Sequence, residues 1–102
     1  MPANEEPIGT VLRYDSKVHA ALVHLDHGEL ATGDVIHIRG RRIECEEDVR
    51  SIRLKEGEAR RAHEGDDVGI VVDYPVESGD SVFRVTDPYD VGAGSALDAV
   101  FR

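Results

Sequence analysis

Glycine-aspartate pairs stand immediately before three short runs of β-branched residues in this sequence. The three segments are Gly33-Asp34-Val35, Gly65-Asp66-Asp67-Val68 and Gly79-Asp80-Ser81-Val82. Glycine adopts a positive φ without steric cost, and an aspartate carboxylate accepts a hydrogen bond from a nearby backbone N–H. The pairs therefore predict tight turns that each lead into a strand. Their spacing is irregular, which indicates repeated turns rather than a solenoid.

Runs rich in β-branched and aromatic residues predict six strands. These are Ile8–Tyr14, Val18–Leu25, Val35–Arg39, Val49–Leu54, Asp67–Val72 and Ser81–Val85. Before residue 86, the only helical signal is a weak one at Ala59–Glu64. Short strands joined by glycine turns favour an all-β fold, a six-stranded closed β-barrel, because closure removes exposed strand edges. The expected core residues are Val11, Leu22, Ile36, Ile52, Val68, Ile70 and Val82. The run Glu46-Glu47-Asp48 is too acidic to lie inside such a barrel.

One domain accounts for the length of 102 residues. Residues 1–6 are polar and predict a disordered N-terminal segment, residues 7–85 form the predicted barrel, and residues 86–102 form a C-terminal extension. No apolar run approaches the roughly 20 residues that cross a bilayer, and the sequence does not begin with a signal-peptide pattern. The single cysteine, Cys45, fits a reducing compartment. We therefore expect a soluble, cytoplasmic protein with no membrane partner.

The C-terminal extension carries a pattern typical of a short helix. Ser95-Ala96-Leu97-Asp98 resembles a capping box, and Leu97, Val100 and Phe101 would share one helical face. A single apolar turn is not stable alone in water. We expect the stripe to dock on the barrel, with docking on a neighbouring subunit or partner as the alternative; the sequence does not specify the oligomeric state.

Basic side chains are concentrated in one segment of an acidic chain whose formal net charge is -9. This net charge disfavours nucleic-acid binding by the whole surface. The eight bases between residues 39 and 61 are Arg39, Arg41, Arg42, Arg50, Arg53, Lys55, Arg60 and Arg61. Converging arginines would hold an RNA backbone through phosphate and sugar, since no aromatic residue lies in the segment for base stacking. The alternative is a solvated face in which acids of the same segment pair with these bases. Those acids are Glu44, Glu46, Glu47, Asp48, Glu56 and Glu58.

No group of residues predicts a catalytic site, a metal or another cofactor. Cys45 is flanked by glutamates, whose charges raise the pKa of a thiol and suppress the thiolate. A zinc site needs three or four converging ligands, and the spacing of His24, His27 and His37 does not force convergence. His19 and His24 are expected on opposite faces of one strand. No serine stands in a G-x-S-x-G elbow.

Several short motifs follow one another in a set order between residues 7 and 85. Gly9-Thr10-Val11 lies in the first predicted strand, and Gly28-Glu29-Leu30 precedes Gly33-Asp34-Val35-Ile36. The most specific motif, Ala62-His63-Glu64-Gly65-Asp66-Asp67-Val68-Gly69-Ile70, precedes Gly79-Asp80-Ser81-Val82-Phe83-Arg84-Val85. Over residues 7–85 the chain resembles the second domain of translational GTPases such as elongation factor Tu, a six-stranded β-barrel. It is most similar to stand-alone translation elongation factor-like proteins, and a similar barrel ends some collagenase-like U32 peptidases.

The resemblance implies a non-catalytic binding module. The GTPase domain of the full factors is missing, and neither lysine follows a glycine as a phosphate-binding loop requires, so we expect no GTP binding. Asp66-Asp67-Val68-Gly69 fits a D-x-x-G pattern, which we interpret as a turn. The expected partner is RNA, either transfer or ribosomal, or a translation-associated protein. The alternative is a protein-interaction subunit that works in trans with a larger U32-like peptidase and has no RNA role.

Overall fold

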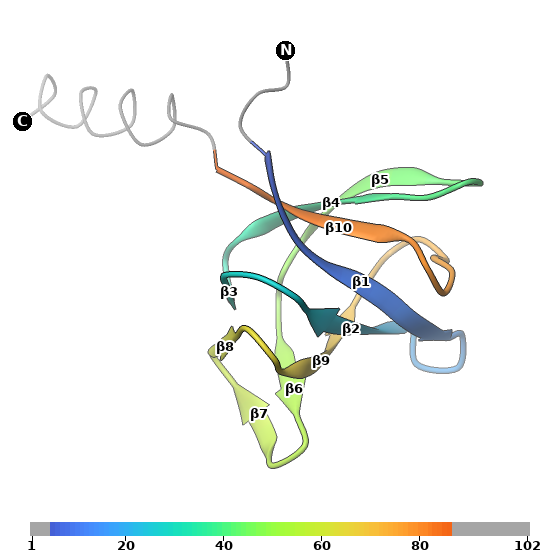
Figure 1. Ribbon diagram of the computed structural model, residues 1–102. Helices are drawn as coiled ribbons and strands as arrows, with labels where there is room; N and C mark the ends of the chain where they lie inside the picture. The colour runs from blue at the N-terminus through green and yellow to red at the C-terminus, as the bar shows by residue number, and fades with distance from the viewer. Residues whose placement is uncertain (1–4, 87–102) are drawn as a thin grey trace, which may run out of the picture.

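Strands make up all the regular structure in residues 5–86, the part of the chain that the computed structural model describes (Figure 1). They are β1 (Glu5–Asp15), β2 (Ala20–Leu25), β3 (Glu29–Ala31), β4 (Val35–Arg39), β5 (Glu44–Asp48), β6 (Ile52–Leu54), β7 (Gly57–Ala59), β8 (Arg61–His63), β9 (Asp67–Val71) and β10 (Ser81–Val85). Strand β1 includes Glu5 and Glu6, which the sequence assigned to the N-terminal segment. The helical signal at Ala59–Glu64 is wrong, because this stretch contributes to β7 and β8. The predicted C-terminal helix lies outside the described residues.

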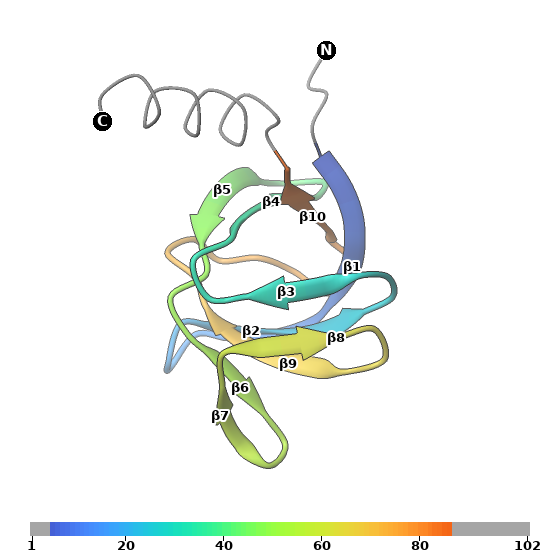
Figure 2. The same ribbon diagram turned by 90° about the vertical axis from the view of Figure 1, so that its left-hand side faces the viewer.

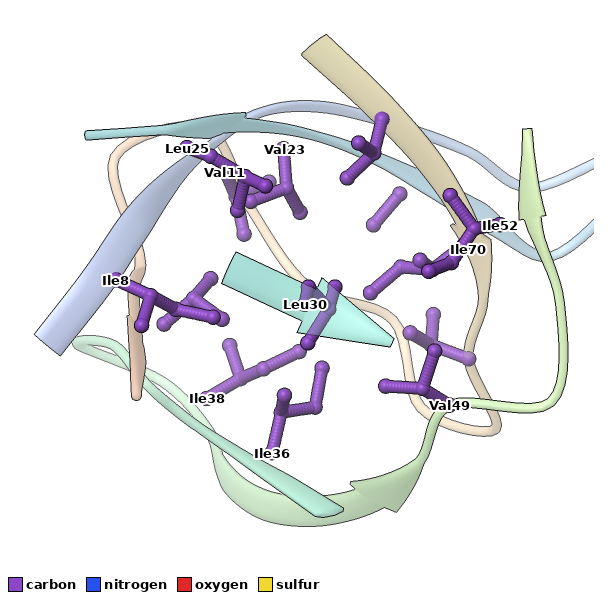
Figure 3. Close-up of a cluster of buried hydrophobic side chains, with 14 of the residues drawn as sticks. Ile8, Val11, Val23, Leu25, Leu30, Ile36, Ile38, Val49, Ile52 and Ile70 are labelled. Atoms are coloured by element: carbon purple, nitrogen blue, oxygen red, sulfur yellow. The ribbon is translucent and has the colours of Figure 1, made fainter. Parts of the chain in front are cut away.

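Eight strands form one antiparallel sheet in the order β5-β4-β10-β1-β2-β9-β6-β7, and β3 pairs with β8 in a second, two-stranded sheet. The large sheet curls so that its strands surround one core, and β3 crosses one end of that core (Figures 2 and 3). Within residues 5–86, no ladder joins the edge strands β5 and β7. The all-β class is therefore confirmed. The six-stranded closed barrel is not found, since the described residues form ten strands and their ladder is open. The same residues contain no helix that could span a membrane.

Aliphatic side chains from both sheets fill the core (Figure 3). The buried residues are Ile8, Val11, Ala21, Val23, Leu25, Leu30, Ile36, Ile38, Val49, Ile52, Ala62, Val68, Ile70, Val72, Val76 and Val82. Of the predicted core residues, only Leu22 is misplaced, because it is half-buried on the outer face of β2. Side chains alternate along a strand, so the inward direction of Val23 directs Leu22 outward.

The three glycine-aspartate turns have the predicted geometry. They span residues 31–34, 63–66 and 77–80, and their glycines have φ of 96°, 94° and 95°. In each turn the aspartate carboxylate accepts a hydrogen bond from the backbone N–H of the residue three positions earlier, with an N···O distance of 2.8–2.9 Å. The aspartate N–H donates to the carbonyl of that same residue at 3.0–3.1 Å. Each turn is therefore closed by two hydrogen bonds, one between backbone groups and one to the aspartate side chain.

Each turn is also clamped to a buried residue of another segment by two backbone hydrogen bonds. The glycine N–H donates to the carbonyl of Val49, Leu25 or Val11, at 2.8 Å in all three turns. The aspartate carbonyl accepts the N–H of the same residue at 2.8–2.9 Å. Because the clamped residues belong to the core, these bonds join the turns to the interior.

A buried carboxylate links β5 to the segment that follows β9. The side chain of Glu47 is 1% exposed, and its oxygens accept the N–H of Asp73 at 2.9 and 3.0 Å and the N–H of Tyr74 at 3.2 Å. We call this contact between β5 and residues 72–76 the seam. The prediction that the acidic run stays outside is wrong for Glu47, because backbone donors compensate the burial of its charge.

Candidate interaction surface

The predicted basic segment does not form a single cluster. Arg39, Arg41 and Arg42 lie at the tip of the β4–β5 hairpin, and the other five bases lie on or beside β6, β7 and β8. Figures 1 and 2 show these two hairpins at opposite ends of the molecule. The structure thus divides the candidate RNA-binding residues between two separate sites, which weakens their combined attraction for a phosphate backbone.

Half of the eight bases form ion pairs. Arg39 pairs with Glu5 and Glu44, Arg42 with Glu77, Arg50 with Glu47 and Asp73, and Arg61 with Glu29. Most of these acids lie outside residues 39–61, so the pairing inside the segment that the sequence suggested is largely replaced by long-range pairing. Arg41, Arg53, Lys55 and Arg60 make no ion pair with the described residues.

Arg50 and Arg60 line one shallow depression of about 500 Å³. Thr32, Ser51, Ala59 and Glu58 complete its wall, so an acid lines the depression together with the two arginines. Asp73, which lies 3.1 Å from Arg50, reduces the positive charge further. The depression therefore presents mixed charges rather than a strong anion site.

A network of ion pairs covers the outer face where β1, β10 and β4 meet. His37 contacts Glu5 through Nδ1 and Glu44 through Nε2, the latter at 2.9 Å. The Arg39 guanidinium lies 4.8 Å from the ring centre of Phe83. The hydrogen bond from His37, followed by the charges of His37 and Arg39, lowers the pKa of Glu5 below its usual value. These groups satisfy one another and tie the start of β1 to β4.

The histidines do not converge on a metal site. Within residues 5–86, no three His, Cys, Asp or Glu side chains are grouped to hold an ion. His24 instead contacts Asp67 at 2.6 Å through Nδ1 and Asp26 at 3.7 Å through Nε2. The bond to Asp67 raises the pKa of His24 above its usual value. The predicted opposition of His19 and His24 across one strand is wrong, because His19 lies in the β1–β2 turn with φ of 54°.

The environment of Cys45 suppresses its thiolate, as the sequence predicted. Burial is the main cause that raises the pKa of this thiol, to about 11, and the charges of Glu47 and Asp80 add to it. The sequence attributed the effect to the flanking glutamates, but only Glu47 among them contributes. Asp80 comes close through the fold.

Apolar side chains gather on the outer face of β1, β2 and β9. Three of the four large hydrophobic residues exposed in the described part of the chain are here: Leu12 (41%), Val18 (61%) and Val71 (39%). Ala20 and Leu22 are half-buried on the same outer side of β2. This surface was not predicted from the sequence, because Leu22 was expected in the core. Alternation along β2 was the signal that could have predicted it: if Val23 and Leu25 point into the core, Leu22 points outward.

A depression of about 160 Å³ lies on this face, and we call it the Gly69 notch. It is lined by Arg13, Asp15, Val18, Ala20, Ala21, Leu22 and Gly69. The register places Arg13 opposite Leu22, Leu22 opposite Gly69, and Gly69 opposite Arg53. Because Gly69 has no side chain, a gap opens between Leu22 and Arg53 in this row.

Comparison with known proteins finds similarity to part of a protease and to the C-terminal domain of a U32 peptidase. No family model matches the sequence. An uncharacterised protease of Methanocaldococcus jannaschii is 35% identical over 81 residues, which is 78% of this chain and 20% of the protease. The chain thus spans about a fifth of the length of that curated relative.

Two solved structures share the fold, and both are of the C-terminal domain of a Geobacillus thermoleovorans protein assigned to the U32 peptidases. One, a selenomethionine variant, has a TM-score of 0.70 at 25% identity and covers 76% of this chain and 96% of that domain. The other has a TM-score of 0.72 at 24% identity and covers 78% and 91%. These comparisons support the U32 part of the expected resemblance. They give no support to the identification with elongation factor Tu.

Proposed function

We propose that this chain is a non-catalytic protein-interaction module that works in trans with a larger U32-peptidase-like protein. The observation that carries the proposal is the extent of the structural match, which includes nearly the whole of a domain that is C-terminal in such a protein. The similarity to part of an archaeal protease agrees with it. The module would do from a separate chain what the C-terminal domain does within the peptidase.

The surface of the described residues supports binding rather than chemistry. The thiol of Cys45 is held protonated, and the histidines with carboxylate partners sit in ion pairs on the outer faces of the sheet. The exposed apolar residues on β1, β2 and β9 offer area of the kind that protein partners cover. An RNA partner has less support, because the basic residues are divided and half of them are already paired.

The test is a binding measurement with a U32-peptidase-like protein from the same organism, prepared with and without its own C-terminal domain. We expect a one-to-one complex with the truncated protein by analytical ultracentrifugation, because the vacated position is free. The isolated C-terminal domain should compete with this chain for that position. The proposal fails if the truncated protein does not bind, or if the chain purified from cells carries RNA and no peptidase-like protein.

A further inference from the structure

We propose that the Gly69 notch is a docking site for an acidic segment of a partner protein, with one apolar side chain of that segment entering the notch. The identity of the partner rests on the proposed function, whereas the chemistry of the docked segment does not. The proposal follows from the size of the notch, the residues that line it and the charges on either side.

The size and the lining of the notch fit a single side chain. Small-molecule sites usually enclose roughly 300–1,000 Å³, whereas this depression has about 160 Å³. Val18, Ala20 and Leu22 supply apolar contact, and Gly69 provides the open floor between two strands. An apolar side chain that enters here covers surface that is now exposed to water, which favours its binding.

Two arginines lie at the two ends of the row that contains the notch; Arg13 also lines the notch itself. Arg13 lies next to Leu22 in the row, and Arg53 lies next to Gly69. Neither arginine makes an ion pair with another described residue, although Arg39, Arg42, Arg50, Arg61 and Arg84 all do. Arginine binds carboxylates through paired N–H donors. On a chain that is acidic overall, this pair of free cations favours carboxylates in the docked segment.

The acids near the notch set the direction of docking. Asp15 lines the notch, and one oxygen of its carboxylate accepts the N–H of Lys17 at 2.9 Å. Its remaining charge repels an acidic segment at that end. At the other end of the row, Glu58 is opposite Arg53 in the β6–β7 ladder, and its charge also repels an acidic segment. The carboxylates of the partner are therefore expected between these two acids, along the row from Arg13 to Arg53. No aromatic side chain lines the notch, so it lacks the stacking surface that single-stranded RNA uses.

Titration of the full chain with synthetic peptides tests the chemistry directly. The probe is a ten-residue peptide of alternating aspartate and leucine, observed through backbone amide resonances. We expect shifts at Leu22, Gly69 and Arg53. One matched peptide has lysine in place of aspartate and another has alanine in place of leucine; each should bind at least about fivefold more weakly, since each lacks one of the two contacts.

Variants of this chain locate the binding. Arg13→Glu combined with Arg53→Glu should weaken the probe at least about tenfold. The matched control, Arg41→Glu with Arg60→Glu, makes the same change of charge at two other unpaired arginines and should leave binding nearly unchanged. Gly69→Val fills the notch and should also abolish binding. The strand accepts it, because a Cβ at Gly69 would lie 3.8 Å from that of Arg53, an ordinary contact.

Four results overturn the proposal. The first is the absence of probe shifts at the notch, and the second is an equal loss of binding in the control variant. The third is movement of the notch resonances on dilution alone, which would make a second copy the occupant. The fourth is movement of the same resonances on deletion of residues 88–102, which would make the chain's own C-terminal segment the occupant. Probe binding at the notch without any complex with the peptidase-like protein would refute only the partner's identity.

Discussion

The wall of the molecule formed by β4, β10, β1, β2 and β9 differs from the seam between β5 and residues 72–76 in what holds it together. Every neighbouring pair in the wall is joined by a backbone ladder of four or more registered residue pairs. Across the seam there is no such ladder between described residues; instead, the carboxylate of Glu47 accepts hydrogen bonds from the backbone N–H groups of Asp73 and Tyr74. The wall distributes its polar bonds over many backbone groups, whereas the hydrogen bonds of the seam converge on the Glu47 carboxylate, beside the ion pair of Arg50 with Asp73. The following variants compare the two.

Truncation of the wall's core should have the largest effect. Ile70 is 2% exposed and lies between Ala21 and Ile52 in the ladder. Ile70→Ala leaves a cavity, and we expect the free energy of unfolding to fall by about 2–5 kcal/mol in chemical denaturation. Its exposed neighbour is the control, since Val71→Ala should cost about 0.5 kcal/mol or less. Equal losses would show that this part of the wall is not a packed core.

Removal of the seam's carboxylate should rank second. Glu47→Ala leaves the N–H groups of Asp73 and Tyr74 without their acceptor, which costs about 1–3 kcal/mol. Glu47→Gln keeps one acceptor oxygen and should lose less. Exchange of these two amide protons, measured by NMR, should rise in the alanine variant. Glu46→Ala, at the exposed adjacent position, serves as the control; a similar loss there would mean that the seam has another support.

The glycine-aspartate turns allow the same aspartate-to-alanine substitution to be made beside the wall and beside the seam. The turn at residues 31–34 clamps Val49, directly after β5, whereas the turn at residues 63–66 clamps Leu25 in β2. Asp34→Ala and Asp66→Ala each remove one hydrogen bond to a backbone N–H, worth about 1 kcal/mol. We expect the first to lower the melting temperature more, since Val49 lies outside every strand ladder of the described part of the chain. The reverse order would contradict the view that the seam is the weaker region.

The smallest effect is expected at an exposed ion pair on the wall. Asp67 raises the pKa of His24 above the ordinary value of 6.5, so the protonated histidine stabilises the folded chain. This contribution to stability is fully present at a pH below the pKa of His24 in the unfolded chain. It is lost as the pH rises through the higher pKa that His24 has in the folded chain. The difference in melting temperature between the chain and His24→Asn should therefore be larger at pH 6 than at pH 9. A difference that does not vary with pH would rule out this linkage.

The sequence predicted the parts of the fold that depend on local rules. The glycine-aspartate turns and the apolar runs of β4, β9 and β10 follow from backbone freedom and period-two alternation. Strands β3, β7 and β8 have only three residues each, too few for a periodic signal. The sequence of β5 lacks the pattern of a strand, because four of its five residues are acidic. It becomes a strand because β4 offers it a ladder and the seam offers Glu47 its donors.

The candidate interaction surface was harder to predict because it depends on register. The Gly69 notch brings together Arg13, Leu22 and Gly69 from three strands, and no sequence motif relates them. The basic segment was visible as a count of charges, but its division between two hairpins follows from the order of the strands. A local sequence pattern therefore predicts which residues could contribute to a binding surface. It does not predict which of them lie side by side in the folded chain.

The open ladder of residues 5–86 leaves two strand edges that a second copy could extend into a fibre. At the edge formed by β5, the exposed residues Glu44, Glu46 and Asp48 carry like charges that repel an identical strand. The other edge, β7, has only three residues and offers few bonds to an incoming strand. Charge protects the first edge and shortness protects the second. Replacement of these three acids by neutral residues removes the first protection, so such a variant at high concentration is the form in which this protein would polymerise.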